Sequence, residues 1–358
     1  MRRPLITAIL AAITVAAVPF IARASSAEAC AGLIGSNGAV NLERTSTLAG
    51  YHNGVEHYVT AFKFQGSGGE FGSLIPLPGV PTKVERGGGW TLQRLDRETQ
   101  QFNLGFAAAE SLDDSAKRAE VLQEVRIDAL DITILKGGAP AIAAWAGEHG
   151  FRLSPDAPEV LDFYAARSPI FLAAVFDGKA AAVRGQALGD GTPVHLTIPT
   201  DDPWVPLRIL GLGKAPEDRV DADVYLLTDR KPALLPAPGP GLDLLHSDPA
   251  TDLLLSDLRT DDGGSWVPEK AWLTKLAVNT TAADLKFDLA IEASGFGQPS
   301  RVAAGLELPD FVPTVLPLER SASPVGWTLI VLAALLLTAM AAVTLRPSVA
   351  RTWTDRRD

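Results

Sequence analysis

Two close pairs of aspartates have the residue type and spacing that carbohydrate chemistry or calcium binding requires. Asp201 and Asp202 are adjacent, and Asp221 and Asp223 are two residues apart. Paired carboxylates act as acid and base in hydrolysis, or bind calcium together with backbone carbonyls. Neither segment has the alternating aspartates, glycine and distal glutamate of a helix–loop–helix calcium site. Asp201-Asp202-Pro203 is also typical of a turn before a strand, so a catalytic or calcium-binding pair and a merely solvated acidic face both stay open.

His52 and His57 flank Asn53-Gly54, a two-residue hairpin turn signal, because both turn residues tolerate positive φ. In such a hairpin residue 52 faces 55 and residue 50 faces 57, so the two histidines share a face as diagonal neighbours about 7–8 Å apart. They would hold a metal only with a third ligand such as Glu56 or Glu43. Exposed hairpin histidines are the commoner arrangement, so we expect no metal here.

The remaining motifs indicate no cofactor. The glycine runs 66–69 and 87–89 lack the Lys-Ser/Thr ending of a phosphate-binding loop, and Gly35-Ser36-Asn37-Gly38 is not a nucleophile elbow. A single cysteine, Cys30, excludes a disulfide framework and a multi-cysteine metal site. The formal net charge of −10 argues against nucleic acid as a partner.

Residues 1–29 are typical of an export signal. Two arginines near the start precede an uncharged apolar run at 6–17, which is too short to span a hydrocarbon layer about 30 Å thick. Two small-residue cleavage patterns follow, Ala22-Arg23-Ala24 and Ala27-Glu28-Ala29, and cleavage after the second would leave Cys30 as the first mature residue. Cys30 then resembles the lipid-modified cysteine of bacterial lipoproteins, but Ala27 stands where leucine is usual and Glu28 is an unusual neighbour, so the sequence favours an unmodified cysteine.

Residues 324–345 predict a membrane anchor. The segment has no charged residue and, as a helix, would rise about 33 Å, enough to cross a bilayer. Four arginines follow it in the tail 346–358, and positive residues stay on the cytoplasmic side. We therefore expect a cell-membrane protein with one span, an extracytoplasmic N-terminal domain at 30–294 and a proline-rich stalk at 295–323.

Between the two membrane signals the apolar spacing predicts an α+β domain, mainly antiparallel sheet with a few helices. The expected β segments are a hairpin within 39–64 and strands at 71–77, 121–127, 131–135, 170–176, 193–198, 205–210 and 220–228. The expected helices are 139–149, a second that starts at Ser154-Pro155, and 253–258, with further ordered segments at 271–278 and 287–293. Residues 98–118 predict a helix fragment or loop, and the proline-rich residues 231–249 a surface loop or extended spacer.

The order of several segments resembles the bacterial family called domain of unknown function 2330. Ala29-Cys30-Ala31-Gly32 is followed by the hairpin and then by Phe71-Gly72-Ser73-Leu74-Ile75-Pro76-Leu77-Pro78-Gly79-Val80-Pro81, a strand that ends in a Pro-x-Pro-Gly-x-Pro turn. The similar later pieces are 132–135, the helix that contains Trp145 and leads to Gly150, 164–176, 193–199, Pro206-Leu207-Arg208 and Trp272-Leu273-Thr274-Lys275-Leu276.

This resemblance covers roughly residues 29–293. It implies an exported protein that is often anchored by a C-terminal span, and it brings no activity, cofactor or catalytic residue. Many members have a second cysteine soon after the first. This chain has Leu33-Ile34-Gly35 there, so that disulfide is excluded.

Two classes of function follow from these observations. The first is a noncatalytic envelope protein that is held by the span at 324–345 and binds a partner protein or a wall polymer. The alternative is an extracytoplasmic hydrolase or transferase that acts on cell-wall material through the carboxylates of Asp201, Asp202, Asp221 or Asp223. The topology and the lack of a catalytic motif favour the noncatalytic protein.

Overall fold

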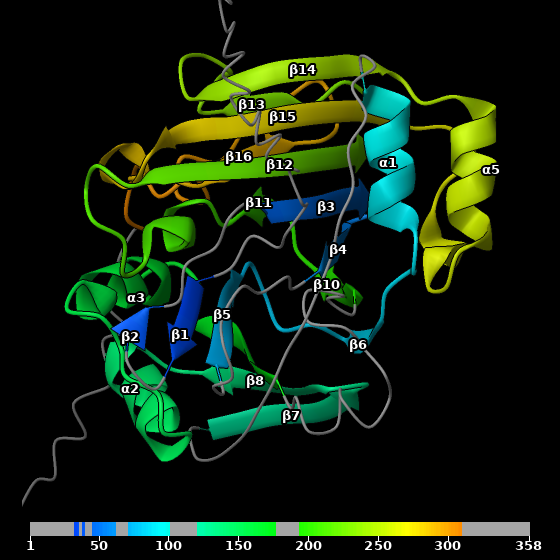
Figure 1. Cartoon of the computed structure of the whole chain (residues 1–358). Coiled ribbons are helices and arrows are strands. Elements are labelled where there is room, and N and C mark those ends of the chain that lie inside the picture. Colours follow the sequence, from blue (N-terminus) through cyan, green and yellow to red (C-terminus); the bar gives the residue numbers. More distant parts are fainter. Residues whose placement is uncertain are drawn as a thin grey trace, which may run out of the picture. The chain divides into compact units, whose positions relative to one another are not determined.

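Three largely antiparallel sheets and four α-helices form the part of the chain that the computed structural model describes, residues 32–35, 38–39, 45–61, 71–100, 120–176 and 193–309. Figure 1 shows their arrangement. The chain divides into two units, 1–309 and 310–358, and the described residues all belong to the first. The predicted export signal, Cys30, the span at 324–345 and the basic tail lie outside the described residues.

The six-stranded sheet has the order β2-β1-β5-β9-β8-β7. Its strands are β1 (Gly32–Gly35), β2 (Gly38–Ala39), β5 (Phe71–Leu77), β7 (Glu120–Ile127), β8 (Leu130–Lys136) and β9 (Ile170–Phe176). All its pairs are antiparallel. β5 and β9 are buried along their whole length, as continuous apolar runs predict for strands packed on both faces.

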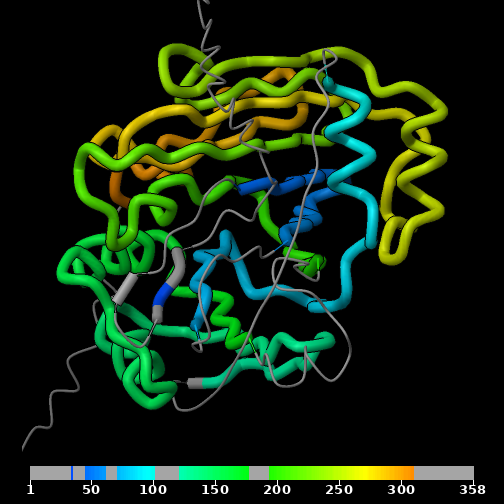
Figure 2. The backbone as a smooth tube through the Cα atoms, in the orientation of Figure 1, coloured from blue at the N-terminus to red at the C-terminus, as the bar shows by residue number. Residues whose placement is uncertain are grey.

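The seven-stranded sheet has the order β14-β15-β12-β3-β4-β10-β6. Its strands are β3 (Thr45–His52), β4 (Val55–Ala61), β6 (Lys83–Arg86), β10 (Pro193–Pro199), β12 (Arg219–Thr228), β14 (Leu242–Pro249) and β15 (Trp272–Thr281). A smaller sheet has the order β11-β16-β13, made of β11 (Trp204–Val205), β13 (Ala233–Leu235) and β16 (Leu289–Glu292). One pairing is parallel, between β3 and β12, and Figure 2 shows these two segments, which are far apart in the sequence, side by side.

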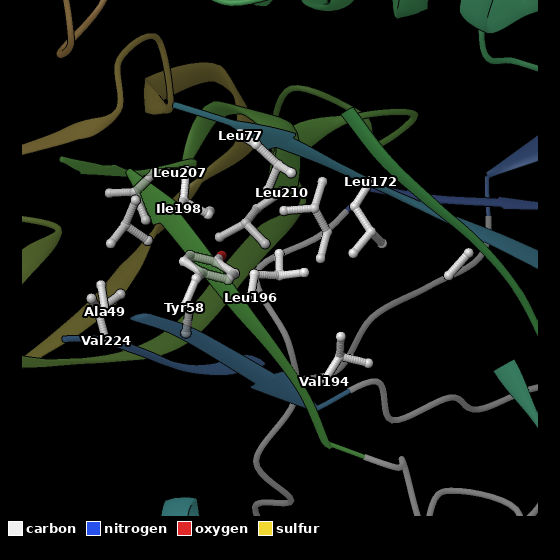
Figure 3. Packing of buried hydrophobic residues seen from close by; sticks show 14 of the residues in the cluster. Ala49, Tyr58, Leu77, Leu172, Val194, Leu196, Ile198, Leu207, Leu210 and Val224 are labelled. Carbon is white, nitrogen blue, oxygen red and sulfur yellow. The ribbon is translucent and has the colours of Figure 1, made fainter. Parts of the chain in front are cut away.

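Each large sheet is covered on one face by two helices and shares the other face with the second sheet. The helices are α1 (Thr91–Thr99), α2 (Ala139–Glu148), α3 (Ala157–Ala165) and α5 (Asp252–Thr260). One apolar cluster joins the six-stranded sheet to α2 and α3, and another joins the seven-stranded sheet to α1 and α5. The largest cluster lies between the sheets, where Leu77 and Leu172 of one meet Tyr58, Leu196 and Ile198 of the other (Figure 3).

The predicted hairpin is confirmed in its register as well as its place. Asn53 and Gly54 have φ angles of 52° and 76°, as a two-residue turn of this type requires. Gly50 pairs with His57 and His52 pairs with Val55. The α+β class and the predicted strands at 71–77, 121–127, 131–135, 170–176, 193–198 and 220–228 are likewise confirmed, as are the three helices.

Two predicted segments are wrong. Residues 205–210 do not form a strand, because β11 ends before Pro206 and the chain then turns into the 3-10 helix η1 (Arg208–Gly211). Residues 231–249 are not a surface loop or extended spacer but contain β13 and β14. β14 was missed because it is an exposed edge strand with a register shift between Leu244 and His246, which breaks the two-residue alternation.

The ordered domain continues beyond residue 294, into the segment predicted as a stalk. Ala303 and Ala304 are buried in the cluster beneath α2 and α3, and the Ala304 carbonyl accepts a hydrogen bond from Asp288 N–H at 3.0 Å. Within the described residues no helix has the length and apolar character needed to cross a bilayer.

Candidate functional site

A groove with a volume of about 500 Å³ opens where the ends of the seven-stranded and small sheets meet. Leu207, Leu242, Val278, Leu285 and Phe287 give it apolar walls. Asn279, Thr280 and Asp284 add polar groups. Small-molecule sites typically measure 300–1,000 Å³ and combine apolar walls with a few polar groups that orient the ligand. The groove has a volume within this range and both kinds of lining group, while Leu207, Leu242, Val278 and Leu285 are themselves buried.

One side of the groove is the tight turn Pro240-Gly241. Gly239 and Leu242 exchange two backbone hydrogen bonds around it, at 3.0 and 2.9 Å. Gly241 has φ of +85°, and a Cβ there would lie 3.0 Å from the Thr280 side chain. The Asn279 N–H donates to the Gly241 carbonyl at 3.0 Å. Glycine is therefore required at position 241 to hold the turn against β15.

The opposite wall, at Leu207, is fixed by a buried polar network of Asp288, Arg167 and Tyr164, which we call the Asp288 network. Asp288 Oδ1 accepts the Leu207 and Arg208 N–H groups at 2.7 and 2.9 Å and the Tyr164 hydroxyl at 2.9 Å. Its Oδ2 forms an ion pair with Arg167, and both side chains are almost fully buried. Through Tyr164 the network ties α3 to the Leu207 segment of the groove wall.

Two polar groups of the groove already have partners. The Thr281 hydroxyl donates to Asp284 Oδ2 at 2.7 Å, and the Arg219 guanidinium donates to Asn279 Oδ1. Asp284 and Asn279 are both exposed. These two hydrogen bonds fix the orientations of the Asp284 carboxylate and the Asn279 amide, which together form the polar edge of the groove. Polar groups held in one orientation suit the groove to selecting among ligands.

A second cluster lies on the helix-covered face of the seven-stranded sheet. His57 Nδ1 and His195 Nε2 are 3.0 Å apart, and His195 Nδ1 is 3.3 Å from Glu85 Oε1. The Trp266 ring stacks on His57 with centroids 4.3 Å apart and covers Gly50, where an added Cβ would lie only 2.1 Å from the ring. The three strands β4, β10 and β6 supply the polar groups.

Burial controls the protonation of this cluster. It lowers the pKa of His57 to about 3, with the neighbouring His195 as a smaller cause. Burial also lowers the pKa of His195, and the Glu85 carboxylate opposes that shift. Both imidazoles are therefore neutral near pH 7, and one ring nitrogen must donate to the other. The cluster joins β4 and β10 through this hydrogen bond between the two rings, and His57 is half-buried.

The predicted carboxylates do not form one site. Asp201 and Asp202 are exposed on the bend before β11, where the Asp202 N–H donates to Thr200 Oγ1 at 3.2 Å. Asp223 is buried 3.9 Å from Lys275 Nζ, and the half-buried Asp221 is 4.0 Å from Arg219. One pair thus lies on the bend before β11 and the other on β12, and the two do not share one set of neighbours.

The predicted histidines also have separate partners. His52 Nδ1 lies 2.5 Å from Asp229 Oδ1, whereas His57 contacts His195. Within the part of the chain that the structure describes, no group of three or more histidine, cysteine or acidic side chains has the geometry of a metal site.

Sequence reasoning missed His195 and Asp288, and it named Glu56 only as a third ligand for a metal at the hairpin histidines. His195, Glu56 and Asp288 each sit among apolar residues in a strand or beside one, and all three are buried. A polar residue inside a predicted buried strand is the signal that was available, because such a residue needs a partner in the fold. The partners themselves come from distant segments, so spacing alone does not reveal them.

One family model matches more than half of the chain. The model of an uncharacterised protein family conserved in bacteria, domain of unknown function 2330, matches residues 24–234, more than half of the chain. The chain belongs to this family. The match takes in the hairpin, the six-stranded sheet and β12, whereas most of the groove is formed by residues after 234.

No curated protein matches the chain at a significant level. Among solved structures, a caspase-8/p35 complex gives a chain with 10% identity and a TM-score of 0.37, covering 69% of this chain and 95% of that one. A mutated baculovirus p35 after caspase cleavage gives 8% identity and a TM-score of 0.39, covering 71% and 98%. At these scores neither fold nor function is transferred.

Proposed function

We propose that this member of the family is an exported envelope protein, held by a single C-terminal span, whose domain binds a partner protein or wall component without chemical turnover. The observation that carries the binding role is the groove, with its apolar walls and oriented polar edge. The export signal and the charge-free run at 324–345, followed by arginines, support the location.

The acidic character of the chain narrows the ligand. The exposed Asp284 carboxylate lies in the groove, and the protein has a formal net charge of −10. The Asp284 carboxylate and the negative net charge of the protein both repel anionic ligands. The groove therefore suits an uncharged or cationic segment with an apolar part, such as a stretch of a protein or an N-acylated wall sugar.

The carboxylate chemistry of the alternative function gains no support from the geometry. The charge of Asp223 faces the ammonium of Lys275, and Asp201 and Asp202 are at a surface bend. A pair that acts on a glycosidic bond needs two carboxyl groups facing one substrate.

The binding role is tested by filling the groove. Full-length protein in detergent is used to capture components of an envelope extract, with wild type compared to Thr280→Trp, which places an indole in the groove. Thr260→Trp, at an exposed position at the end of α5, is the matched control. We expect specific retention by wild type and Thr260→Trp and its loss in Thr280→Trp. Equal retention by all three would refute a role of the groove.

The location is tested separately by protease treatment of intact cells. The proposed topology places the domain outside, so an epitope in the domain is expected to be digested while one on the tail 346–358 survives. A domain that stays protected until the cells are lysed would overturn the orientation.

A further inference from the structure

One buried lysine on the helix-covered face of the seven-stranded sheet contacts two carboxyl groups. Lys275 of β15 has only 7% of its side chain exposed. Its Nζ lies 3.0 Å from Oδ1 of Asp96 on α1 and 3.9 Å from Oδ1 of Asp223 on β12. The proposed binding role uses none of these three residues.

The sheet register brings the amine and the Asp223 carboxyl group together. Tyr225 of β12 is directly opposite Lys275 of β15, and Asp223 is two residues before Tyr225. Asp223 is therefore the diagonal neighbour of Lys275 on the same face of the sheet. Lys275 Nζ lies 5.1 Å from the centre of the Tyr225 ring, and the Asp223 side chain is only 8% exposed. The two groups thus meet where water has little access.

Asp96 is placed to carry protons between the amine and its surroundings. Its side chain is 35% exposed, and the oxygen that contacts Lys275 also accepts the Tyr225 hydroxyl at 3.1 Å. Burial, together with the carboxylates of Asp223 and Asp96, raises the pKa of Tyr225, so this hydroxyl stays protonated and continues to donate. The hydrogen bond from Tyr225 therefore holds Asp96 beside the amine whatever the charge on Lys275.

We propose that Lys275 and Asp223 join in an amide bond between their side chains, with Asp96 as the proton carrier, so that β12 and β15 become covalently cross-linked. The contacts described above are those of the pair before the bond forms. The cross-link is a property of the folded chain, and it is independent of the groove and of the location of the protein.

The reaction balances without an oxidant or a co-reactant. Asp96 takes one proton from the Lys275 ammonium and passes it to the Asp223 carboxylate, which leaves a neutral amine beside a neutral carboxyl group. The Nζ lone pair then forms a bond to Cγ of Asp223. A second proton from the nitrogen passes through Asp96 to the oxygen that received the first, the C–O bond breaks, and one water molecule leaves. No atom is oxidised or reduced, and Asp96 ends as the carboxylate it was at the start.

Burial favours the amide over the ion pair. Taking an ammonium and a carboxylate out of water carries a desolvation cost that their attraction repays only in part. Amide formation removes one positive and one negative charge from the buried site. The exposed pair of Lys83 and Glu85 lacks this advantage: its Nζ–Oε2 distance is 2.6 Å, but the Lys83 side chain is 61% exposed, so water stabilises its charge.

The bond closes residues 223–275 into a ring. This ring contains β13, β14 and α5, so these elements stay attached to the centre of the sheet even when their hydrogen bonds open. Like a disulfide that closes a long loop, the cross-link lowers the entropy of the unfolded chain and so stabilises the fold.

The test is peptide mapping of the full-length protein by mass spectrometry after tryptic digestion. Trypsin cuts after lysine and arginine, so an unlinked chain gives the separate peptides 220–230, 271–275 and 276–286. The amide blocks cleavage after Lys275 and joins 271–286 to 220–230 in one branched species, lighter by one water molecule than the two peptides together. Lys83 is the internal control, and cleavage after it is expected in the same digest.

Two variants separate the reaction from a chance contact. Asp96→Asn keeps the shape of the side chain but cannot take the ammonium proton, so the branched species should form roughly 100-fold more slowly. Asp221→Asn, on the same strand as Asp223 but beside Arg219, is the matched control and should react as wild type. The branched fraction is measured at increasing times after expression begins.

Separate peptides from folded wild-type protein would overturn the proposal, and so would a branched species that joins Lys275 to the peptide 95–97, which contains Asp96. Undiminished linkage in Asp96→Asn would overturn the role of Asp96 as proton carrier. The wild-type digest decides the matter even if a variant folds poorly. A groove that retains nothing from an envelope extract would refute the binding role and leave the branched species unchanged.

Discussion

Replacement of Asp288 by asparagine is the sharpest probe of how the fold holds the groove wall. The change keeps the size of the side chain. It also leaves an Oδ1 that can still accept from Tyr164 and from the Leu207 and Arg208 N–H groups. What is lost is the Oδ2 carboxylate oxygen, which an amide NH₂ replaces in front of the Arg167 guanidinium. The variant therefore isolates the ion pair from the rest of the network.

The magnitude follows from burial. The side chains of Arg167 and Asp288 are 4% and 0% exposed, so the guanidinium loses its counter-ion where water cannot replace it. Breaking a buried pair from one side costs about 3–5 kcal/mol. For a domain of this size each kcal/mol lowers the melting temperature by roughly 2–4 °C, so we expect Tm to fall by roughly 10 °C.

The assay is urea and thermal unfolding of the full-length protein, followed by circular dichroism. Arg167→Met should lose a similar free energy of unfolding, because it leaves the buried carboxylate unpaired. The double variant Arg167→Met/Asp288→Asn should be clearly more stable than the sum of the two losses predicts, since neither charge is then left alone.

The control is the exposed pair Arg301–Glu307, whose side chains are 56% and 54% exposed. Glu307→Gln is expected to change the free energy of unfolding by less than about 1 kcal/mol. A loss below about 1 kcal/mol for Asp288→Asn, or strict additivity in the double variant, would refute the assigned role of the buried pair.

Three further predictions concern single positions. Gly50→Ala should lower the free energy of unfolding by about 1–3 kcal/mol in urea titrations, because the new Cβ overlaps the Trp266 ring. Trp266→Leu in the same chain should restore much of this loss, and a double variant without any such rescue would contradict the contact. Thr251→Ala removes the hydroxyl that accepts the Leu254 N–H at 3.2 Å and caps α5, so a loss of about 1 kcal/mol is expected, and an unchanged urea midpoint would argue against the cap. Burial raises the pKa of Glu56 from 4.5 to about 8 in the folded state. Its contribution to the free energy of unfolding is therefore complete below pH 4.5 and is lost as the pH rises through about 8. Between these pH values the free energy of unfolding falls by about 1.4 kcal/mol per pH unit. This pH slope should vanish from the free energy of unfolding of Glu56→Gln, and an identical slope in the variant would exclude Glu56 as its source.

Local signals in the sequence are sufficient for much of the fold. The hairpin register follows from Asn53-Gly54, because two residues at positive φ allow one connection of this length. The buried strand Ile170–Phe176 follows from its continuous apolar run. The hairpin register and this strand both depend on residues that are neighbours in the chain. The spacing of residue types can predict structure only when the interacting residues are close in the sequence.

The site could not be predicted in the same way. The groove joins the turn at Gly241 to Leu207 and to Asp284, and only the completed sheets bring these together. His57 was identified as a candidate, yet its partner His195 comes from β10 rather than from the hairpin. Such contacts depend on strand order, and strand order is not visible in the alternation of apolar and polar residues.

The parallel pairing of β3 with β12 determines when the seven-stranded sheet can form. β3 pairs with β4 as soon as the hairpin has been synthesised, but its other edge waits for residues 219–228. Contacts between such distant segments close slowly, and until then the chain lacks its central ladder. A chain that ends before residue 219 therefore lacks the partner of one edge of β3, and the seven-stranded sheet cannot be completed in it.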